Sequence, residues 1–152
     1  MIEMAQQEIK VIVFQLSDEE YGIPVQQVRS IEKVQHITRV PRTAPFVKGV
    51  INLRGVVTPI IDLRTRFSLG EKEYSDSTRI IIVALENMEV GLIVDAANDV
   101  IDIKADAVEP PPEVVGAVEA DYIKGVAKVG KRLLILLNLD HVLNSDDLKE
   151  IK

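Results

Sequence analysis

The sequence predicts a mainly β protein made of two small closed barrels that share one apolar layer. Two observations predict this fold. Apolar residues are mostly Val, Ile and Leu, in runs of four to seven that end at Gly, Pro, Asp or Asn, which is typical of short strands joined by turns. The chain also repeats itself internally, so each half is expected to form one five-stranded unit.

Ten short strands are expected along the chain: Lys10–Leu16, Tyr21–Pro24, Ile31–Thr38, Gly49–Leu53, Val56–Asp62, Arg79–Leu85, Val90–Val94, Val100–Ile103, Ile123–Val129 and Arg132–Leu139. Helical spacing of apolar residues is weaker and predicts short helices at Gln26–Ser30 and Leu63–Leu69, and a C-terminal helix at His141–Ile151. We expect these helices to flank the core.

The repeat predicts that both halves open and close with the same hairpin. Residues 12–25 align without gaps on residues 81–94 at an offset of 69 residues. Residues 49–63 align on residues 125–139 at an offset of 76 residues. Both hairpins should therefore recur in the fold.

The repeat divides the chain into residues 9–75 and 76–152. An exchange of the N-terminal strand between the halves stays open, within one domain overall. Five strands per half are too few for an open sheet with protected edges, which favours two closed barrels with a cleft between them.

Composition excludes several classes of site. The 152 residues contain no cysteine, which excludes disulfides, thiolate metal sites and a cysteine nucleophile. A net charge of -6 argues against nucleic-acid binding. The first residues do not resemble a secretory signal, and no apolar run approaches the roughly 18 residues of a membrane span. We expect a cytoplasmic protein without direct membrane contact.

The search for chemistry finds no catalytic, metal or cofactor site. His36 and His141 have no partner at metal-ligand spacing. The glycines are spaced wrongly for a phosphate-binding loop. The acidic residues considered stand at strand ends or turns, where Asp commonly bonds to nearby backbone: Asp62, Asp95, Asp99 and Asp102.

Arg54 is the strongest candidate for a binding residue. It lies between two apolar strands, where only a tight turn with Gly55 fits. It is either a solvated hairpin tip or a guanidinium presented to an acidic or carbonyl-rich partner. The second half has Lys128–Lys131 in place of the Asn52–Gly55 tip. We therefore assign the possible binding role only to the hairpin tip of the first half.

Six apolar residues are expected either in the core or along a groove between the barrels that would accept a helix with anchors at helical spacing. They are Val25, Val28 and Ile31 and their counterparts Val94, Ala97 and Val100.

Four segments together resemble the CheW-like coupling proteins of bacterial chemotaxis. They are Tyr21–Val25, Phe46–Leu63 (FVKGVINLRGVVTPIIDL), Val90–Asp95 and Leu134–Leu143. The resemblance runs from about Glu8 to Leu148, and the central segment is the most specific.

The resemblance implies two SH3-like five-stranded β-barrels packed pseudo-symmetrically, and a non-enzymatic adaptor without a cofactor. Such a protein couples the cytoplasmic tips of methyl-accepting chemoreceptors to the histidine kinase CheA. It is expected to be a monomer when isolated and to reach membrane receptor arrays through its partners.

The resemblance also assigns contact residues. The receptor-binding set is Ile12, Val25, Val28, Ser30, Ile31, Arg54 and Ala97. Ser30 stands where the family often has an acidic residue, and Glu32 follows two positions later. The kinase-binding set is Arg42, Pro45, Val56, Thr58, Glu113 and Val114.

Two other functions are weighed against the adaptor. An SH3-like module unrelated to chemotaxis would bind proline-rich peptides in an aromatic-lined groove. The chain has no Trp, and the aromatic residues available are Phe14, Tyr21, Phe46, Phe67, Tyr74 and Tyr122. A small-ligand enzyme would need a concave pocket with convergent polar groups.

Overall fold

The fold is described from a computed structural model, which covers residues 8–70, 72–85, 88–110, 114–115 and 118–143. The strands are β1 (Glu8–Leu16), β2 (Glu19–Pro24), β3 (Val28–Lys33), β4 (Val47–Leu53), β5 (Val56–Asp62), β6 (Arg79–Leu85), β7 (Met88–Val94), β8 (Ala96–Lys104), β9 (Val108–Glu109), β10 (Val114–Val115), β11 (Val118–Glu119), β12 (Ile123–Val129) and β13 (Arg132–Leu137). The helices are the 3-10 turns η2 (Val25–Gln27), η3 (Ala105–Ala107) and η4 (Ala120–Tyr122) and the α-helices α1 (Leu63–Arg66) and α2 (Leu139–Val142). The mainly β prediction is confirmed.

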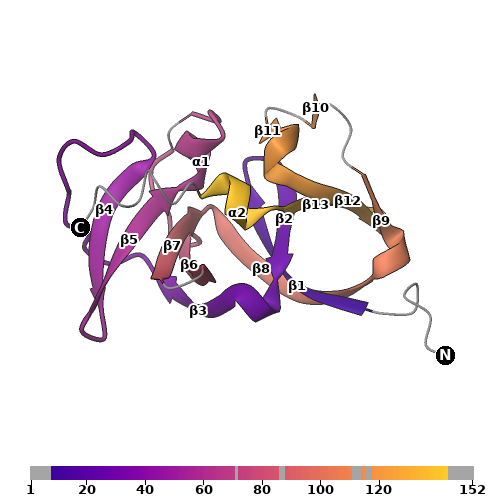
Figure 1. Ribbon diagram of the computed structural model, residues 1–152, viewed down its shortest axis with the longest axis horizontal. Coiled ribbons are helices and arrows are strands. Elements are labelled where there is room, and N and C mark those ends of the chain that lie inside the picture. Colours follow the sequence, from indigo (N-terminus) through magenta and orange to yellow (C-terminus); the bar gives the residue numbers. More distant parts are fainter. Residues whose placement is uncertain (1–7, 71, 86–87, 111–113, 116–117, 144–152) are drawn as a thin grey trace.

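Two sheets lie side by side with α2 between them (Figure 1). The six-stranded sheet has the order β8-β1-β2-β13-β12-β9, and the five-stranded sheet has the order β3-β6-β7-β5-β4. The short strands β10 and β11 pair only with each other. The chain passes between the sheets through η2, after β2, and again at Asp95, after β7. Each sheet therefore contains strands from both repeats.

The two sheets have equivalent strand orders. Shifting β1, β2 and β8 by 69 residues, and β12 and β13 by 76, brings them onto β6, β7, β3, β4 and β5 of the other sheet. The parallel ladder pairs Leu136 with Gly22 in the six-stranded sheet. The equivalent ladder pairs Ile60 with Gly91 in the five-stranded sheet. The repeat in the sequence therefore extends to the register of the strands.

Glycine is needed where these parallel strands meet. A Cβ on Gly91 would lie 2.6 Å from Ile60 Cδ1 and 2.7 Å from Ile80 Cγ2. A Cβ on Gly22 would lie 3.0 Å from Leu136 Cδ2. Because the neighbouring side chains occupy the space of a methyl group, a glycine lets them pack over the strand.

The prediction of closed five-stranded barrels is wrong in two respects. One sheet has six strands, and within the described residues both sheets keep two edge strands, β8 and β9 in one and β3 and β4 in the other. Closure would need a ladder between these edges. The segments that follow β3 and β8 instead form a single bridge, Thr38 to Val50, and the two-residue strand β9, which are too short to close a barrel.

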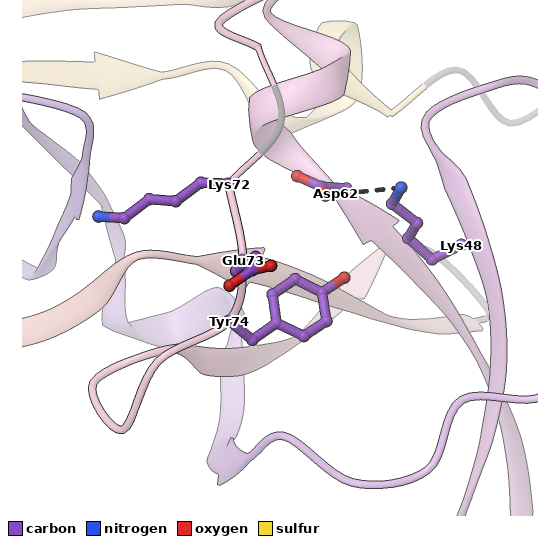
Figure 2. Close-up of a pocket in the computed structure, with 5 residues that line it drawn as sticks. All are labelled: Lys48, Asp62, Lys72, Glu73 and Tyr74. Atoms are coloured by element: carbon purple, nitrogen blue, oxygen red, sulfur yellow. Dashed lines mark ion pairs between the residues drawn. The ribbon is translucent and has the colours of Figure 1, made fainter.

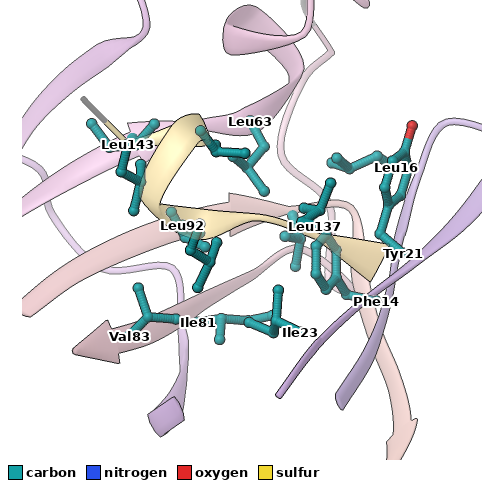
Figure 3. Packing of buried hydrophobic residues seen from close by; sticks show 14 of the residues in the cluster. Phe14, Leu16, Tyr21, Ile23, Leu63, Ile81, Val83, Leu92, Leu137 and Leu143 are labelled. Carbon is teal, nitrogen blue, oxygen red and sulfur yellow. The ribbon is translucent and has the colours of Figure 1, made fainter. Parts of the chain in front are cut away.

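The core has three parts, as expected for two curled sheets sharing an apolar layer. One small cluster includes Val11, Val13 and Leu134 of the six-stranded sheet. A second includes Ile51, Ile60 and Ile80 of the five-stranded sheet. The largest cluster joins both sheets, and Figure 3 shows Phe14, Tyr21, Ile81, Leu92 and Leu137 within it, among other residues. Burial of this shared layer holds the sheets together.

The helices are shorter than predicted. The helix expected at Gln26–Ser30 is the single turn η2, after which β3 begins at Val28 rather than at Ile31. The helix at Leu63–Leu69 ends at Arg66. The C-terminal helix starts earlier than predicted, as α2, and its expected continuation through residues 144–151 lies outside the described residues.

Candidate functional site

The β4–β5 hairpin ends in a two-residue turn that fixes Arg54 in space. Arg54 has φ 52° and Gly55 has φ 87°. Positive φ at both central residues is the pattern of a type I′ turn, which matches the twist of a hairpin. The Gly55 amide donates to Asn52 Oδ1 at 2.8 Å. The Asn-Leu-Arg-Gly sequence therefore stabilises its own turn through the hydrogen bond between Gly55 and Asn52.

The Arg54 side chain is 73% exposed and reaches across to the edge strand β3. Its Nη2 donates to Glu32 Oε2 at 3.4 Å, and the Glu32 side chain is 19% exposed. An ion pair this exposed contributes little to stability. Glu32 thus orients the guanidinium while leaving its other donors free for a ligand.

Exposed apolar side chains occur on the two strands next to this arginine, β5 after the turn and β3 across the ion pair. Val56 and Val57, directly after the turn, are 54% and 68% exposed, and Ile31 on β3 is 42% exposed. Exposed aliphatic residues on strands next to an exposed arginine are typical of a protein-binding surface. Of the predicted contact residues, Arg54 and Val56 lie on the same hairpin, and the ion pair of Arg54 with Glu32 links this hairpin to β3, the strand that carries Ile31.

The other predicted receptor contacts lie near the two crossings between the sheets. Val25 and Val28 are half-buried and pack against the largest core cluster, and Ala97 is half-buried on β8. The Ser30 hydroxyl is buried and, among the described residues, has no hydrogen-bond partner. Ile12 is only 6% exposed and belongs to the core, so its prediction as a direct contact needs correction.

The predicted kinase contacts are scattered. Arg42, with φ 63°, and Pro45 are exposed on the loop between β3 and β4. Thr58 has no exposed surface, and its hydroxyl donates to the Val56 carbonyl at 3.3 Å. It can support the hairpin but cannot touch a partner. Glu113 lies outside the described residues, and Val114 is placed only by its backbone in β10.

The aspartates named in the sequence search all have structural partners. Asp62 caps α1 by accepting from the Arg64 amide at 2.9 Å and the Thr65 amide at 3.4 Å. Burial raises the pKa of Asp62, although these amides and Lys48 oppose it. Asp95 pairs with Arg64, Asp99 with Arg132 and Asp102 with Lys10. No catalytic pair of carboxylates emerges from this set.

A pocket of about 380 Å³ opens beside α1, lined by Lys48, Asp62, Lys72, Glu73 and Tyr74 (Figure 2). Lys48 Nζ lies 4.0 Å from Asp62 Oδ2 across it. The Lys72 side chain points away from this pair. The lining carries both charges, and its most buried carboxylate already caps a helix, so the pocket offers no set of convergent catalytic groups.

The aromatic residues argue against an SH3-like peptide groove. Phe14, Tyr21, Phe46 and Phe67 are at most 8% exposed. Phe67 packs on Tyr21 and Tyr122, with ring centroids 6.0 and 5.6 Å apart. Because these rings form the core, they cannot line a surface groove for proline-rich peptides.

Two ion-pair networks were missed by the sequence analysis. Arg64 binds Asp95 in a bidentate pair, Nε to Oδ1 at 2.9 Å and Nη2 to Oδ2 at 2.9 Å, and the Ser17 amide donates to the same carboxylate at 2.8 Å. Arg132 binds Glu20 and Asp99. Their partners are 31 to 112 residues apart, so local sequence patterns carry no signal for them.

Within the described ranges, no group of three or more metal-ligating side chains occurs. In the same part of the chain, no helix has the length and apolarity that a membrane crossing requires.

The comparisons with known proteins agree on one protein family. Residues 10–147 match the CheW-like domain family. The chain is 50% identical to chemotaxis protein CheW of Bacillus subtilis over 137 residues, covering 90% of this chain and 88% of that protein. It is 36% identical to CheW of Klebsiella aerogenes, covering 90% and 82%. The crystal structure of the scaffolding protein TtCheW from Thermoanaerobacter tengcongensis matches with a TM-score of 0.83 and 38% identity, covering 91% of this chain and 90% of that one. The chain therefore belongs to the CheW-like family of chemotaxis proteins.

Proposed function

We propose that the chain is a non-enzymatic cytoplasmic adaptor that couples chemoreceptor signalling tips to the histidine kinase CheA. Membership of the CheW-like family supports a role in chemotaxis. The observation that carries the adaptor role is the exposed guanidinium of Arg54, held on a rigid turn that precedes the exposed Val56 and Val57 and paired with Glu32 of β3. A surface built in this way binds a protein rather than transforming a small molecule.

The proposed receptor contact combines Arg54 and Ile31 with the half-buried residues at the crossings, Val25, Val28 and Ala97. Ser30 belongs to this set because of its position on the edge strand β3, where its backbone would make the contact. A receptor tip is a helical bundle, and its apolar positions at helical spacing would lie on these aliphatic side chains. Glu32 supplies the negative charge that the family often has at position 30, because its carboxylate accepts from Arg54.

The proposed kinase contact uses Val56 with Arg42 and Pro45, and a second contact uses Glu113 and Val114. The SH3-like character of each sheet, with a pseudo-twofold relation between them, belongs to the same proposal and is supported by the equivalent strand orders. We further propose that the isolated protein is a monomer that reaches receptor arrays only through these partners.

The test is a binding and kinase assay with Arg54→Ala and Arg54→Glu. Receptor signalling fragments should bind Arg54→Ala about tenfold more weakly, the usual loss for a central arginine of an interface, and Arg54→Glu more weakly still. CheA autophosphorylation with receptors should fall in parallel. Lys104→Ala, an exposed cation on the other sheet, is the matched control. Unchanged receptor affinity in both arginine variants would remove Arg54 from the site, and a wild-type protein that binds neither partner would end the proposal.

A further inference from the structure

The six-stranded sheet contains a salt-bridge cluster at the start of β13. Arg132 donates to Glu20 on β2, Nη2 to Oε2 at 2.9 Å and Nε to Oε1 at 3.1 Å. It also donates twice to Asp99 on the edge strand β8, at 3.1 Å each. The amide of Asn98 joins by donating to Glu20 Oε2 at 3.1 Å. One arginine therefore joins the three strands at this end of the sheet.

The offsets of the repeat locate the equivalent place on the five-stranded sheet. Val56 stands in the place of Arg132, and Glu89 stands in the place of Glu20. The strand pairing supports this equivalence because β5 and β7 have the register of β13 and β2. The five-stranded sheet thus keeps the central carboxylate but has Val56 where Arg132 binds it, and the arginine of this hairpin, Arg54, pairs with Glu32 instead.

The edge strand completes the comparison. Ser30 stands in the place of Asp99, and Arg29 in the place of Asn98, at the same irregularity of the ladder. Within the described residues, Glu89 and Arg29 have no hydrogen bond or ion pair with each other. The buried Ser30 hydroxyl has no partner there either. Glu89 is half-buried on β7, the strand that pairs with β5, and Val56 at the start of β5 is exposed.

We propose that Glu89 is a specificity-determining residue of the Val56 surface and receives an arginine side chain of the partner protein. The partner's guanidinium would take the place that Arg132 takes on the other sheet and donate to Glu89. A half-buried carboxylate without a cation is the complement of such a group. Flanking aliphatic residues of the partner would cover Val56 and Val57. This inference rests on the proposed coupling function, with CheA as the partner.

The test measures the affinity of the full chain for the cognate CheA at two salt concentrations. Glu89→Gln keeps the shape but removes the charge, and it should weaken binding about tenfold and flatten its salt dependence. Val56→Arg supplies the cation from within the chain and should weaken binding at least tenfold. Adding Glu89→Gln to Val56→Arg should cause no further loss, because the carboxylate is already occupied.

Matched controls separate this site from general effects. Asp106→Asn removes an exposed acid of η3, the turn after β8, and Leu133→Arg places an arginine on a residue of the six-stranded sheet that is 52% exposed. Both should bind CheA like the wild type. Thermal unfolding of every variant shows that it is folded. If Glu89→Gln binds with wild-type affinity and salt dependence, or loses no more than Asp106→Asn, the inference is wrong. If the wild type itself does not bind CheA, the proposed function fails instead.

Discussion

Strand β13 begins with Arg132, whereas β5 begins with Val56 at the equivalent place of the other sheet. Arg132 is 35% exposed and is held by two carboxylates, while Val56 is 54% exposed. The backbones follow one plan, with the same strand order and the same register. The difference lies in the side chains. Arg132 fastens one hairpin to its neighbours through two carboxylates, whereas the other hairpin leaves Val56 exposed at this position and has only the 3.4 Å Arg54–Glu32 pair at its turn.

The two crossings between the sheets differ in the same way. At the second crossing, the side chains of Arg64 and Asp95 are 13% and 15% exposed and form a bidentate pair. The equivalent residues of the first crossing are Asp140 and Gln26, both exposed. Among the described residues, no ion pair joins them. The Arg64–Asp95 ion pair therefore holds the second crossing in place. The first crossing depends on the packing of Val25 and Val28 against the core.

The largest expected effect comes from breaking the fixed crossing. Arg64→Ala leaves the half-buried Asp95 carboxylate without its cation, and we expect a loss of about 3 kcal/mol in the free energy of unfolding. Asp140→Ala, the equivalent change at the first crossing, should cost less than about 0.5 kcal/mol. Urea denaturation measures both. Equal losses in the two variants would show that the crossings are held alike.

The pH dependence of stability sharpens this prediction. Burial by itself would raise the pKa of Asp95, but the hydrogen bonds from Arg64 and Ser17 outweigh it and hold the pKa below its ordinary value. The carboxylate therefore stabilises the fold above the pKa of the unfolded chain, about 3.9. This stabilisation is lost as the pH falls through the lower pKa of the folded state. Asp95→Asn should show a smaller loss of stability below about pH 4 than the wild type.

The glycines at the parallel ladders test whether the two sheets are packed equally. Gly91→Ala should cost about 2 kcal/mol, because its methyl group would press on Ile60 and Ile80 at once. Gly22→Ala should cost less, since its tightest contact is the end of the Leu136 side chain at 3.0 Å. Thermal unfolding of the two variants gives the difference. A larger loss for Gly22→Ala would mean that the six-stranded sheet is the more tightly packed of the two.

Much of this fold could be predicted from the sequence because it depends on local patterns. The hairpins β1–β2, β6–β7, β4–β5 and β12–β13 all form where the repeat indicated. Apolar runs and turn residues are sufficient for this. The turn at Arg54 could also be predicted, since a two-residue connection ending in Gly55 leaves few conformations.

The rest depends on partners that a pattern does not identify. The alternation of residues along a strand predicts on which face of the strand Ile12 or Thr58 lies. It does not predict that both faces of the strand are covered at these positions, which is why both residues are buried. The prediction of closed barrels was wrong because the segments after β3 and β8 form too few backbone pairs to close a sheet. The length of this pairing depends on the loops and does not follow from the number of strands. The ladder between β2 and β13 joins residues more than 100 positions apart. Long-range pairing of this kind fixes the sheets and both ion-pair networks.

The smallest expected effect on stability comes from the hairpin turns. Gly130 already has φ 62° at the place equivalent to Arg54, where a residue with a side chain is strained. Arg54→Gly should therefore leave stability unchanged or raise it by up to about 1 kcal/mol, while receptor binding falls. Gly130→Arg should lower stability by a similar amount. Urea denaturation and a receptor pull-down measure the two properties separately. Loss of stability in Arg54→Gly would mean that the arginine supports the hairpin. Higher stability with weaker binding would mean that the strained arginine is kept for its contact, since a glycine serves the same turn in the other sheet.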